Sequence, residues 1–347
     1  MRHLDSPDVR CTEAAAGSVL TSRRYVPFLI KLAVTAGVIW MLLRRVSLGD
    51  VGAVLAGASV AWLAAGVAAQ LALRAANAGR IRLIARSQQV PLSYGMILRT
   101  LFTTAFYGLL LPGTIGAGAA TLVKYVGHGA TWVAALASMV INRLLDLLTS
   151  IALALSFWGL DTSRRPASSS ALILTALLFA PLLLFGGHAL LFRGARLFEH
   201  EAQWLSHGPQ HGTPGLRHHA IRFLHQCAQG GRLTRSGAVA VFGLSVGKEL
   251  LAALIAVCFA RAIGITLPFT TIAWMQAAVG LAVLLPLSVS GLGVREGMLL
   301  LLGQSQGLSP TQALGWGVLQ SSAVLLMAGI GGLLEAQTHW LRARPAT

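Results

Sequence analysis

The chain has 347 residues, of which 55% are hydrophobic and only 11% are charged. A soluble domain of this size normally carries about a quarter charged residues, so the composition excludes an ordinary soluble enzyme. Backbone groups inside lipid must bond within the protein, which leaves helices or a closed barrel as membrane-spanning structures. The apolar runs are too long and continuous for the ~10-residue alternating strands of a barrel. We therefore expect an all-α polytopic membrane protein.

The formal net charge of the chain is +16. An excess of lysine and arginine is typical of cytoplasmic loops, and no soluble basic domain is visible that would bind a nucleic acid. We expect the membrane as partner, and no nucleic acid. The cysteines Cys11, Cys227 and Cys258 lack metal or redox spacing, so we expect no metal and no other cofactor. Residues 1–24 lack the apolar core of a signal peptide, which predicts a cytoplasmic tail.

The first membrane half covers residues 25–192 and contains an interrupted apolar segment. This segment, residues 93–111, ends at a cluster of helix breakers. Breakers at membrane depth are typical of a broken or re-entrant helix, so we expect a helical hairpin here. Its expected turn residues are Pro112, Gly113, Gly116 and Gly118, and full spans are expected at residues 25–43, 60–76, 131–160 and 171–192.

The second membrane half covers residues 236–347 and follows a basic loop of residues 193–235. The loop contains six histidines, but their spacing matches no zinc pattern, so we expect no metal site there. A second apolar segment begins at Pro268 and breaks within the string PLSVSGLGVREG, which predicts a second hairpin. Its expected turn residues are Pro286, Ser290, Gly291 and Gly293, and full spans are expected at residues 237–263 and 310–341.

The charge distribution favours two hairpins that each enter and leave on one side of the membrane. Both termini, the basic stretch within residues 74–86 and the 193–235 loop then all become cytoplasmic. The two halves also become mirror images, because an offset of 174 residues pairs Arg74 with Lys248 and Pro112 with Pro286. Paired Gly/Pro-interrupted segments are the sequence sign of an inverted-repeat transporter. We therefore expect about six full spans plus two re-entrant hairpins in an inverted repeat.

The string at residues 285–297, LPLSVSGLGVREG, is long and specific. It resembles the signature of the flippase-like family typified by the transmembrane domain of lysylphosphatidylglycerol synthases. Residues 111–116 and the NRLLD sequence of residues 142–146 are similar to other landmarks of that family. The resemblance extends over residues 25–340 and implies lipid movement, which we expect in a bacterial inner (cytoplasmic) membrane.

One position departs from the pattern of that family. After the first glycine turn the family usually carries a charged pair, whereas this chain has Ala119, Ala120 and Thr121, with Lys124 as the nearest charge. A mechanism that needs an acidic residue there does not carry over. No segment is long and polar enough to form the aminoacyl-transferase domain of the synthases, so the resemblance implies lipid movement without lipid aminoacylation.

Ionisable residues at membrane depth by default face the protein interior or an aqueous cavity. Arg295 and Glu296 follow the second glycine turn. Arg295 is expected to hold an anionic lipid phosphate while Glu296 orients it; the alternative is a structural pair that locks the hairpin to its neighbours. Arg143 and Asp146 share a helix face and can pair. They form either the polar floor of a headgroup pathway or an internal clamp.

Three further cations complete the expected headgroup-binding set. Lys248 and Arg74, its mate in the repeat, offer positive charge on opposite sides of the midplane, so a crossing phosphate would meet one and then the other. The alternative is that they snorkel toward the interface. Lys124 follows the first hairpin and either binds a lipid phosphate or is an ordinary interfacial lysine.

These features predict a lipid translocase, a flippase or scramblase for an anionic or isoprenoid-linked lipid. The chain carries no Walker A, nucleophile-elbow or HExxH motif, so we expect movement without ATP hydrolysis and assign no catalytic residue. Two alternatives remain open. One is an intramembrane transferase acting on lipid or polyprenyl-phosphate headgroups, with Glu296 or Asp146 as acid or base. The other is a non-catalytic scaffold of a glycolipid pathway.

Overall fold

The regular elements of the computed structural model are all α-helices in the part of the chain that it describes, which confirms the all-α fold class. The described residues are 48–110, 113–161, 233–284 and 291–343, together with the isolated positions 179, 182, 186, 187 and 223. The expected tail of residues 1–24, the expected spans at residues 25–43 and 171–192, and the loop at residues 193–235 lie outside these ranges, apart from those positions and the last three loop residues.

The described part of the first membrane half consists of helices α2 to α6. A bend of 89° separates the first two. Thr131 caps the start of α6, because its side-chain oxygen accepts a hydrogen bond from the backbone N–H of Ala134 at 3.2 Å. The helices are α2 (Leu48–Ala56), α3 (Val60–Ser87), α4 (Tyr94–Leu110), α5 (Gly113–Val126) and α6 (Trp132–Leu160).

The described part of the second membrane half consists of helices α10 to α13. Gly291 and Gly293, two of the expected turn residues, have φ of 78° and 81°, a left-handed conformation that glycine adopts without steric cost. An added Cβ at Gly291 would lie 2.7 Å from Cγ1 of Val283, so only glycine fits there. The helices are α10 (Arg235–Ala262), α11 (Phe269–Leu284), α12 (Val294–Ser305) and α13 (Pro310–Ala343).

Helix α3 continues well beyond residue 76, where its span was expected to end. Its 28 residues extend about 42 Å at 1.5 Å per residue, and the basic stretch within residues 74–86 is therefore helical. Arg80, in the middle of that stretch, is only 1% exposed. The prediction did not continue the helix because it placed the basic stretch at the end of the span, whereas Arg80 pairs with a carboxylate on another helix.

The break in the first interrupted segment is shorter than expected. Gly113, Gly116 and Gly118 lie within α5, so the break between α4 and α5 is confined to residues 111 and 112. Those two residues lie outside the described part of the chain, as do Pro286 and Ser290. An added Cβ at Gly118 would lie 3.6 Å from a methyl group on α6, that of Met139, which is an ordinary contact distance, so the packing of α5 on α6 does not require glycine there.

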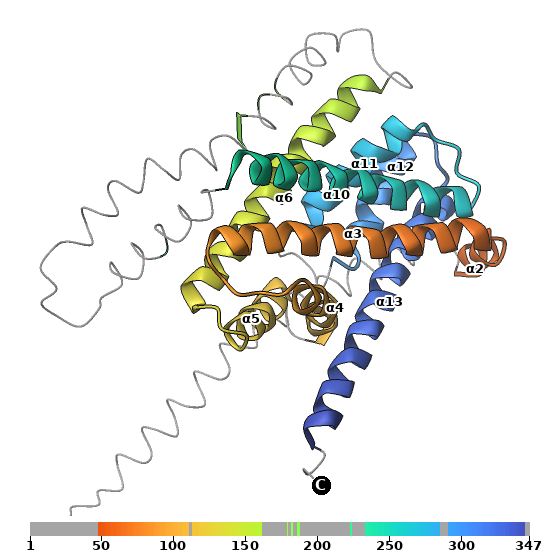
Figure 1. The fold of residues 1–347 in the computed structure, drawn as a ribbon. Helices are drawn as coiled ribbons and strands as arrows, with labels where there is room; N and C mark the ends of the chain where they lie inside the picture. Colours follow the sequence, from red (N-terminus) through yellow and green to blue (C-terminus); the bar gives the residue numbers. More distant parts are fainter. Residues whose placement is uncertain are drawn as a thin grey trace, which may run out of the picture.

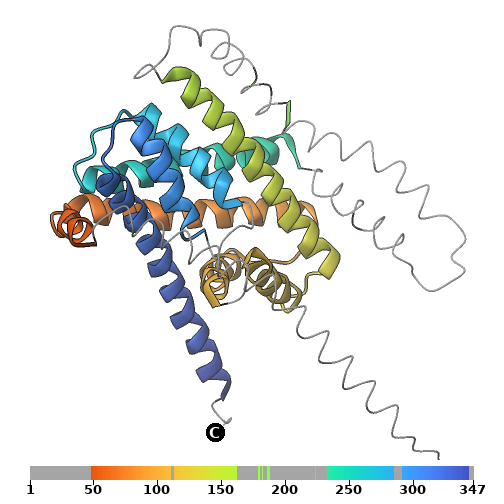
Figure 2. The same cartoon turned by 180° about the vertical axis from the view of Figure 1, so that it is seen from behind.

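The described helices form two crossed layers. Helices α3 and α10 run side by side, and α6, α11 and α12 cross behind them in Figure 1; Figure 2 shows the second layer from the other side. Helix α4 packs on α13, and α6 packs on α11. The main core lies where α3 meets the second half, and it contains Ala69, Phe259, Ile272, Leu299 and Trp316.

Three of the described helices, α6, α10 and α13, are long and apolar enough to cross a membrane, and the bent α2–α3 pair is a fourth candidate. The bounds of α6, α10 and α13 lie within two residues of the spans expected at residues 131–160, 237–263 and 310–341. Continuous apolar composition made these three helices the easiest to predict.

Candidate functional site

Three helices meet at a cluster of four charged side chains. Oδ1 of Asp146 on α6 lies 2.6 Å from Nη2 of Arg80 on α3 and 2.6 Å from Nζ of Lys248 on α10. Lys248 also lies 3.3 Å from Oε1 of Glu249. Two cations and two carboxylates balance, so the formal charge of the cluster is zero. Such a neutral, hydrogen-bonded cluster fastens α3, α6 and α10 together, because separating it would leave buried charges unpaired.

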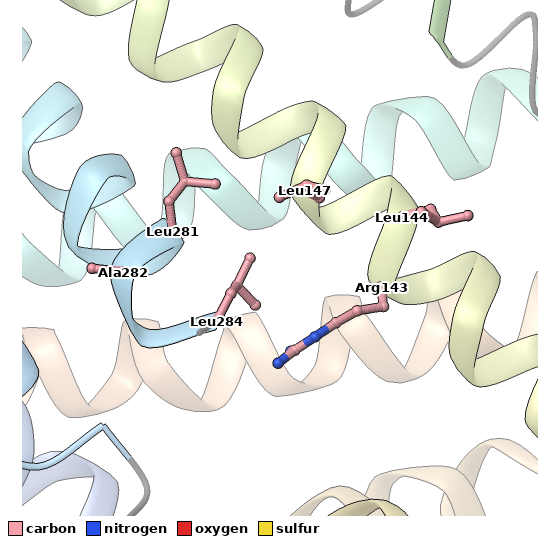
Figure 3. Close-up of a pocket in the computed structure, with 6 residues that line it drawn as sticks. All are labelled: Arg143, Leu144, Leu147, Leu281, Ala282 and Leu284. Atoms are coloured by element: carbon pink, nitrogen blue, oxygen red, sulfur yellow. The ribbon is translucent and has the colours of Figure 1, made fainter. Parts of the chain in front are cut away.

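Arg143 does not form the expected pair with Asp146. Asp146 is bonded to cations from α3 and α10, whereas Arg143 points into a groove between α6 and α11 (Figure 3). Arg143 is exposed. Among the residues that the structure describes, none forms a hydrogen bond or an ion pair with its guanidinium. The spacing of three residues allowed the pair, but the cations of the neighbouring helices hold the carboxylate instead.

The groove beside Arg143 is apolar apart from that guanidinium. Its volume is about 530 Å³. A single cation beside an apolar wall matches an amphipathic ligand, whose chain packs on the wall and whose anionic group meets the arginine. The wall consists of Leu144 and Leu147 from α6 and Leu281, Ala282 and Leu284 from α11.

Arg295 and Glu296 have separate roles at the start of α12. Oε2 of Glu296 accepts a hydrogen bond from the backbone N–H of Gly293 at 2.7 Å, which closes the first turn of the helix. Oε1 of Glu296 accepts a hydrogen bond from the hydroxyl of Ser321 on α13. That hydroxyl in turn accepts a hydrogen bond from Nη1 of Arg295 at 3.2 Å. Glu296 thus locks the second glycine turn to α13, and Ser321 connects it to Arg295.

A smaller cavity of about 180 Å³, with both polar and apolar lining residues, adjoins Arg295. Four helices each contribute one polar side chain to its lining: Gln70 from α3, Gln276 from α11, Arg295 from α12 and Gln320 from α13. Oε1 of Gln276 and Nε2 of Gln320 are buried and have no hydrogen-bond partner among the described residues. The cavity therefore offers hydrogen-bonding groups that the described protein does not use.

Lys124 and Arg74, both expected to meet lipid phosphate, are held by neighbouring helices. Nζ of Lys124 on α5 lies 2.6 Å from Oε2 of Glu335 on α13, whose other oxygen accepts a hydrogen bond from Tyr107 on α4 at 3.0 Å. Nη1 of Arg74 donates to the carbonyl oxygen of Leu101 on α4 at 2.8 Å. Both cations therefore fasten helices in the structure, and α4 is attached on two sides.

The sequence analysis missed Gln70, Gln276 and Gln320 as candidate site residues. It also missed Arg80 and Glu335 as partners of the expected charges. A signal for the glutamines was present, because each interrupts a run of mostly apolar residues, and a polar side chain at membrane depth needs a partner or a cavity. Arg80 offered no such signal, since it could not be told apart from the other arginines of its basic stretch.

The family model of the lysylphosphatidylglycerol synthase TM region matches residues 28–332. The match covers most of the chain and includes all of the described helices up to the last part of α13. Comparison with curated proteins gives no match. Together with the candidate spans, the family match shows an integral membrane protein with a lipid-related role.

Proposed function

Because the chain belongs to the family of the lysylphosphatidylglycerol synthase TM region, we propose that it moves an anionic or isoprenoid-linked lipid between the leaflets of its membrane. The movement needs no ATP hydrolysis and runs downhill or with an ion gradient. The membrane is a bacterial inner membrane, with both termini of the chain in the cytoplasm. The lipid tails stay in the bilayer while the charged headgroup follows the polar surface of the protein.

The exposed guanidinium of Arg143 is the observation that supports this proposal most directly. Arg143 lies about 17 Å along α6 at 1.5 Å per residue, well inside a helix of 29 residues. An arginine at membrane depth requires an anionic partner or water. No described residue supplies the anion, and the groove beside it is lined by leucines. An anionic lipid supplies both the missing negative charge and a chain for the apolar wall.

The contacts of the two candidate carboxylates favour transport over transferase chemistry. Asp146 accepts hydrogen bonds from two cations, and Glu296 accepts them from a backbone N–H and a hydroxyl. A general acid or base must reach the proton of its substrate. Neither carboxylate is among the residues that line the groove, so neither is placed to act on a headgroup there.

We further propose that the two halves form an inverted repeat. Helices α3 to α6 have 28, 17, 14 and 29 residues, and α10 to α13 have 28, 16, 12 and 34, in the same order. The packing also corresponds, because α4 packs on α13 as α11 packs on α6, and α3 packs on its counterpart α10. In inverted repeats, one half rocks against the other around a central site, which exposes the site to each leaflet in turn.

The experiment measures lipid movement in proteoliposomes that contain a trace of fluorescent NBD-phosphatidylglycerol. Dithionite destroys the label only in the outer leaflet, so further loss of fluorescence reports movement from the inner leaflet. The Arg143→Ala variant should slow this movement roughly 10- to 100-fold, because a hydrogen bond to a charged group contributes about 1.5–3 kcal/mol. The side chain is exposed, so its removal should leave the fold intact.

Two control variants make the result specific to the groove. Arg86→Ala removes another exposed arginine, in the last turn of α3, and should leave the rate unchanged. Arg143→Lys keeps the positive charge and should retain part of the rate. A folded Arg143→Ala protein that moves lipid at the wild-type rate would show that the groove is not the route.

A further inference from the structure

The cavity of Gln70, Gln276, Arg295 and Gln320 lies among apolar helices, and the presence of these four polar side chains in its lining requires an explanation. Gln320 is only 6% exposed, and the other three side chains are half-buried. The cavity volume of about 180 Å³ holds roughly six water molecules at about 30 Å³ each. That space also admits a phosphate with a short polyol, whose charged and hydroxyl groups match the four polar side chains. The rest of the lining is apolar: Leu73, Ala252, Ile255, Phe259 and Val324.

Two amide atoms in this cavity lack hydrogen-bond partners among the described residues. They are the acceptor Oε1 of Gln276 and the donor Nε2 of Gln320. The oxygen and nitrogen of either amide can be exchanged without changing this conclusion, because each amide has both a hydrogen-bond donor and an acceptor. A buried polar atom without a partner costs more free energy than a hydrogen bond contributes, so the occupant of the cavity must satisfy both a donor and an acceptor.

Arg295 adds a positive charge to the lining, and the carboxylate of the adjacent Glu296 reaches it only through the hydroxyl of Ser321. Its only hydrogen bond to another described residue runs from Nη1 to Ser321. The neighbouring carboxylate of Glu296 is directed at the glycine turn and at the same serine. Other guanidinium N–H groups of Arg295 thus remain available in a cavity without an acidic lining residue. An occupant with a negative charge as well as a donor and an acceptor therefore matches these groups.

We infer that this cavity binds a phosphate ester that also carries a hydroxyl group, as in the glycerol phosphate end of a lipid headgroup. The phosphate oxygens accept hydrogen bonds from Arg295 and from the amide of Gln320, and the hydroxyl donates to Gln276. A headgroup that ends in an ammonium group has no carboxylate to pair with here and faces Arg295, so hydroxylated headgroups are preferred. The inference rests on the proposed function and names its substrate class; α11 borders both this cavity and the groove of Arg143.

Binding is tested directly on the purified full chain in detergent, with the thermal unfolding temperature as the readout. A ligand that binds only the folded state raises the Tm, so a titration yields an apparent Kd. The probes are dihexanoyl-phosphatidylglycerol, dihexanoyl-phosphatidylethanolamine and the water-soluble sn-glycerol 3-phosphate. The variant Gln320→Leu removes the unpartnered amide at similar volume, and Gln304→Leu makes the same change at an exposed position of α12.

We expect the Kd for dihexanoyl-phosphatidylglycerol to rise at least tenfold in Gln320→Leu and to stay unchanged in Gln304→Leu. The empty Gln320→Leu protein should be no less stable than the wild type, because no described partner of Nε2 is lost. Should this variant fail to fold, Gln276→Leu is measured in its place with the same expectation. Binding of the lipid alone identifies a lipid headgroup site, and binding of glycerol phosphate identifies a free phosphate ester as a ligand; either result supports the inference.

Three results would overturn the inference and leave ordered water as the occupant. The first is the absence of binding by both phosphatidylglycerol and glycerol phosphate. The second is equal affinity for phosphatidylethanolamine and phosphatidylglycerol, and the third is an unchanged Kd in the folded glutamine variant. Lipid movement is a separate readout: movement without such binding contradicts only the inference. Binding without movement of any lipid contradicts the proposed function and leaves the binding site itself intact.

Discussion

The substitution Asp146→Ala should destabilise the fold strongly, because it leaves a buried guanidinium without its counter-charge. Arg80 is 1% exposed and lies 2.6 Å from the carboxylate that is removed. Its remaining partners are neutral: Oδ1 of Asn77 at 3.1 Å and Oγ of Ser245 at 3.3 Å. Breaking a buried ion pair on one side costs about 3–5 kcal/mol. We expect a loss of that size in the free energy of unfolding.

The assay is an SDS titration in mixed micelles that follows the loss of helical signal. Arg86→Ala, at an exposed position, serves as control and should change the free energy of unfolding by no more than about 0.5 kcal/mol. Adding Arg80→Met to Asp146→Ala should recover much of the loss, since the unpaired charge is then gone, while Lys248 keeps Glu249 at 3.3 Å. A loss below about 1 kcal/mol in Asp146→Ala would refute the view that this cluster fastens the three helices.

Two further predictions concern helix α13, and thermal unfolding in detergent checks both. Lys124→Ala breaks an ion pair in which the side chain of Lys124 is 24% exposed and that of Glu335 is 15% exposed. Because water reaches both groups, the free energy of unfolding should fall by only about 1 kcal/mol, and a loss as large as that of Asp146→Ala would contradict this exposure. Gly331→Ala would place a Cβ 2.0 Å from the carbonyl oxygen of Phe102, so α13 must separate from α4 at a cost of about 3 kcal/mol or more. Gly329→Ala, where an added Cβ meets nothing within 4 Å, should instead stabilise the helix by about 0.5–1 kcal/mol, and equal effects of the two substitutions would refute the close packing.

The sequence was sufficient to predict long apolar helices such as α6 and α10, because every turn of them contributes to one continuous hydrophobic pattern. It also located the second glycine turn, where positive φ at Gly291 and Gly293 leaves no other residue type. It failed at α3, because local composition cannot reveal that Arg80 is neutralised by another helix.

The candidate site was predicted in part. Arg143 and Arg295 were singled out because ionisable residues are costly at membrane depth, and both adjoin cavities. Their partners depend on which helices cross, which one sequence does not disclose. The three glutamines around Arg295 lie on helices far apart in the chain, so only the packing of α3, α11 and α13 brings them together.

The most direct test of the central claim is whether the purified chain moves an anionic lipid across a bilayer at all. Proteoliposomes and protein-free liposomes are compared with NBD-phosphatidylglycerol and with a labelled polyprenyl phosphate in the dithionite assay. We predict that the protein accelerates the movement of at least one of these anionic lipids and that Arg143→Ala loses most of the acceleration. If the folded protein leaves the movement of both lipids at the protein-free rate, the translocase account is contradicted.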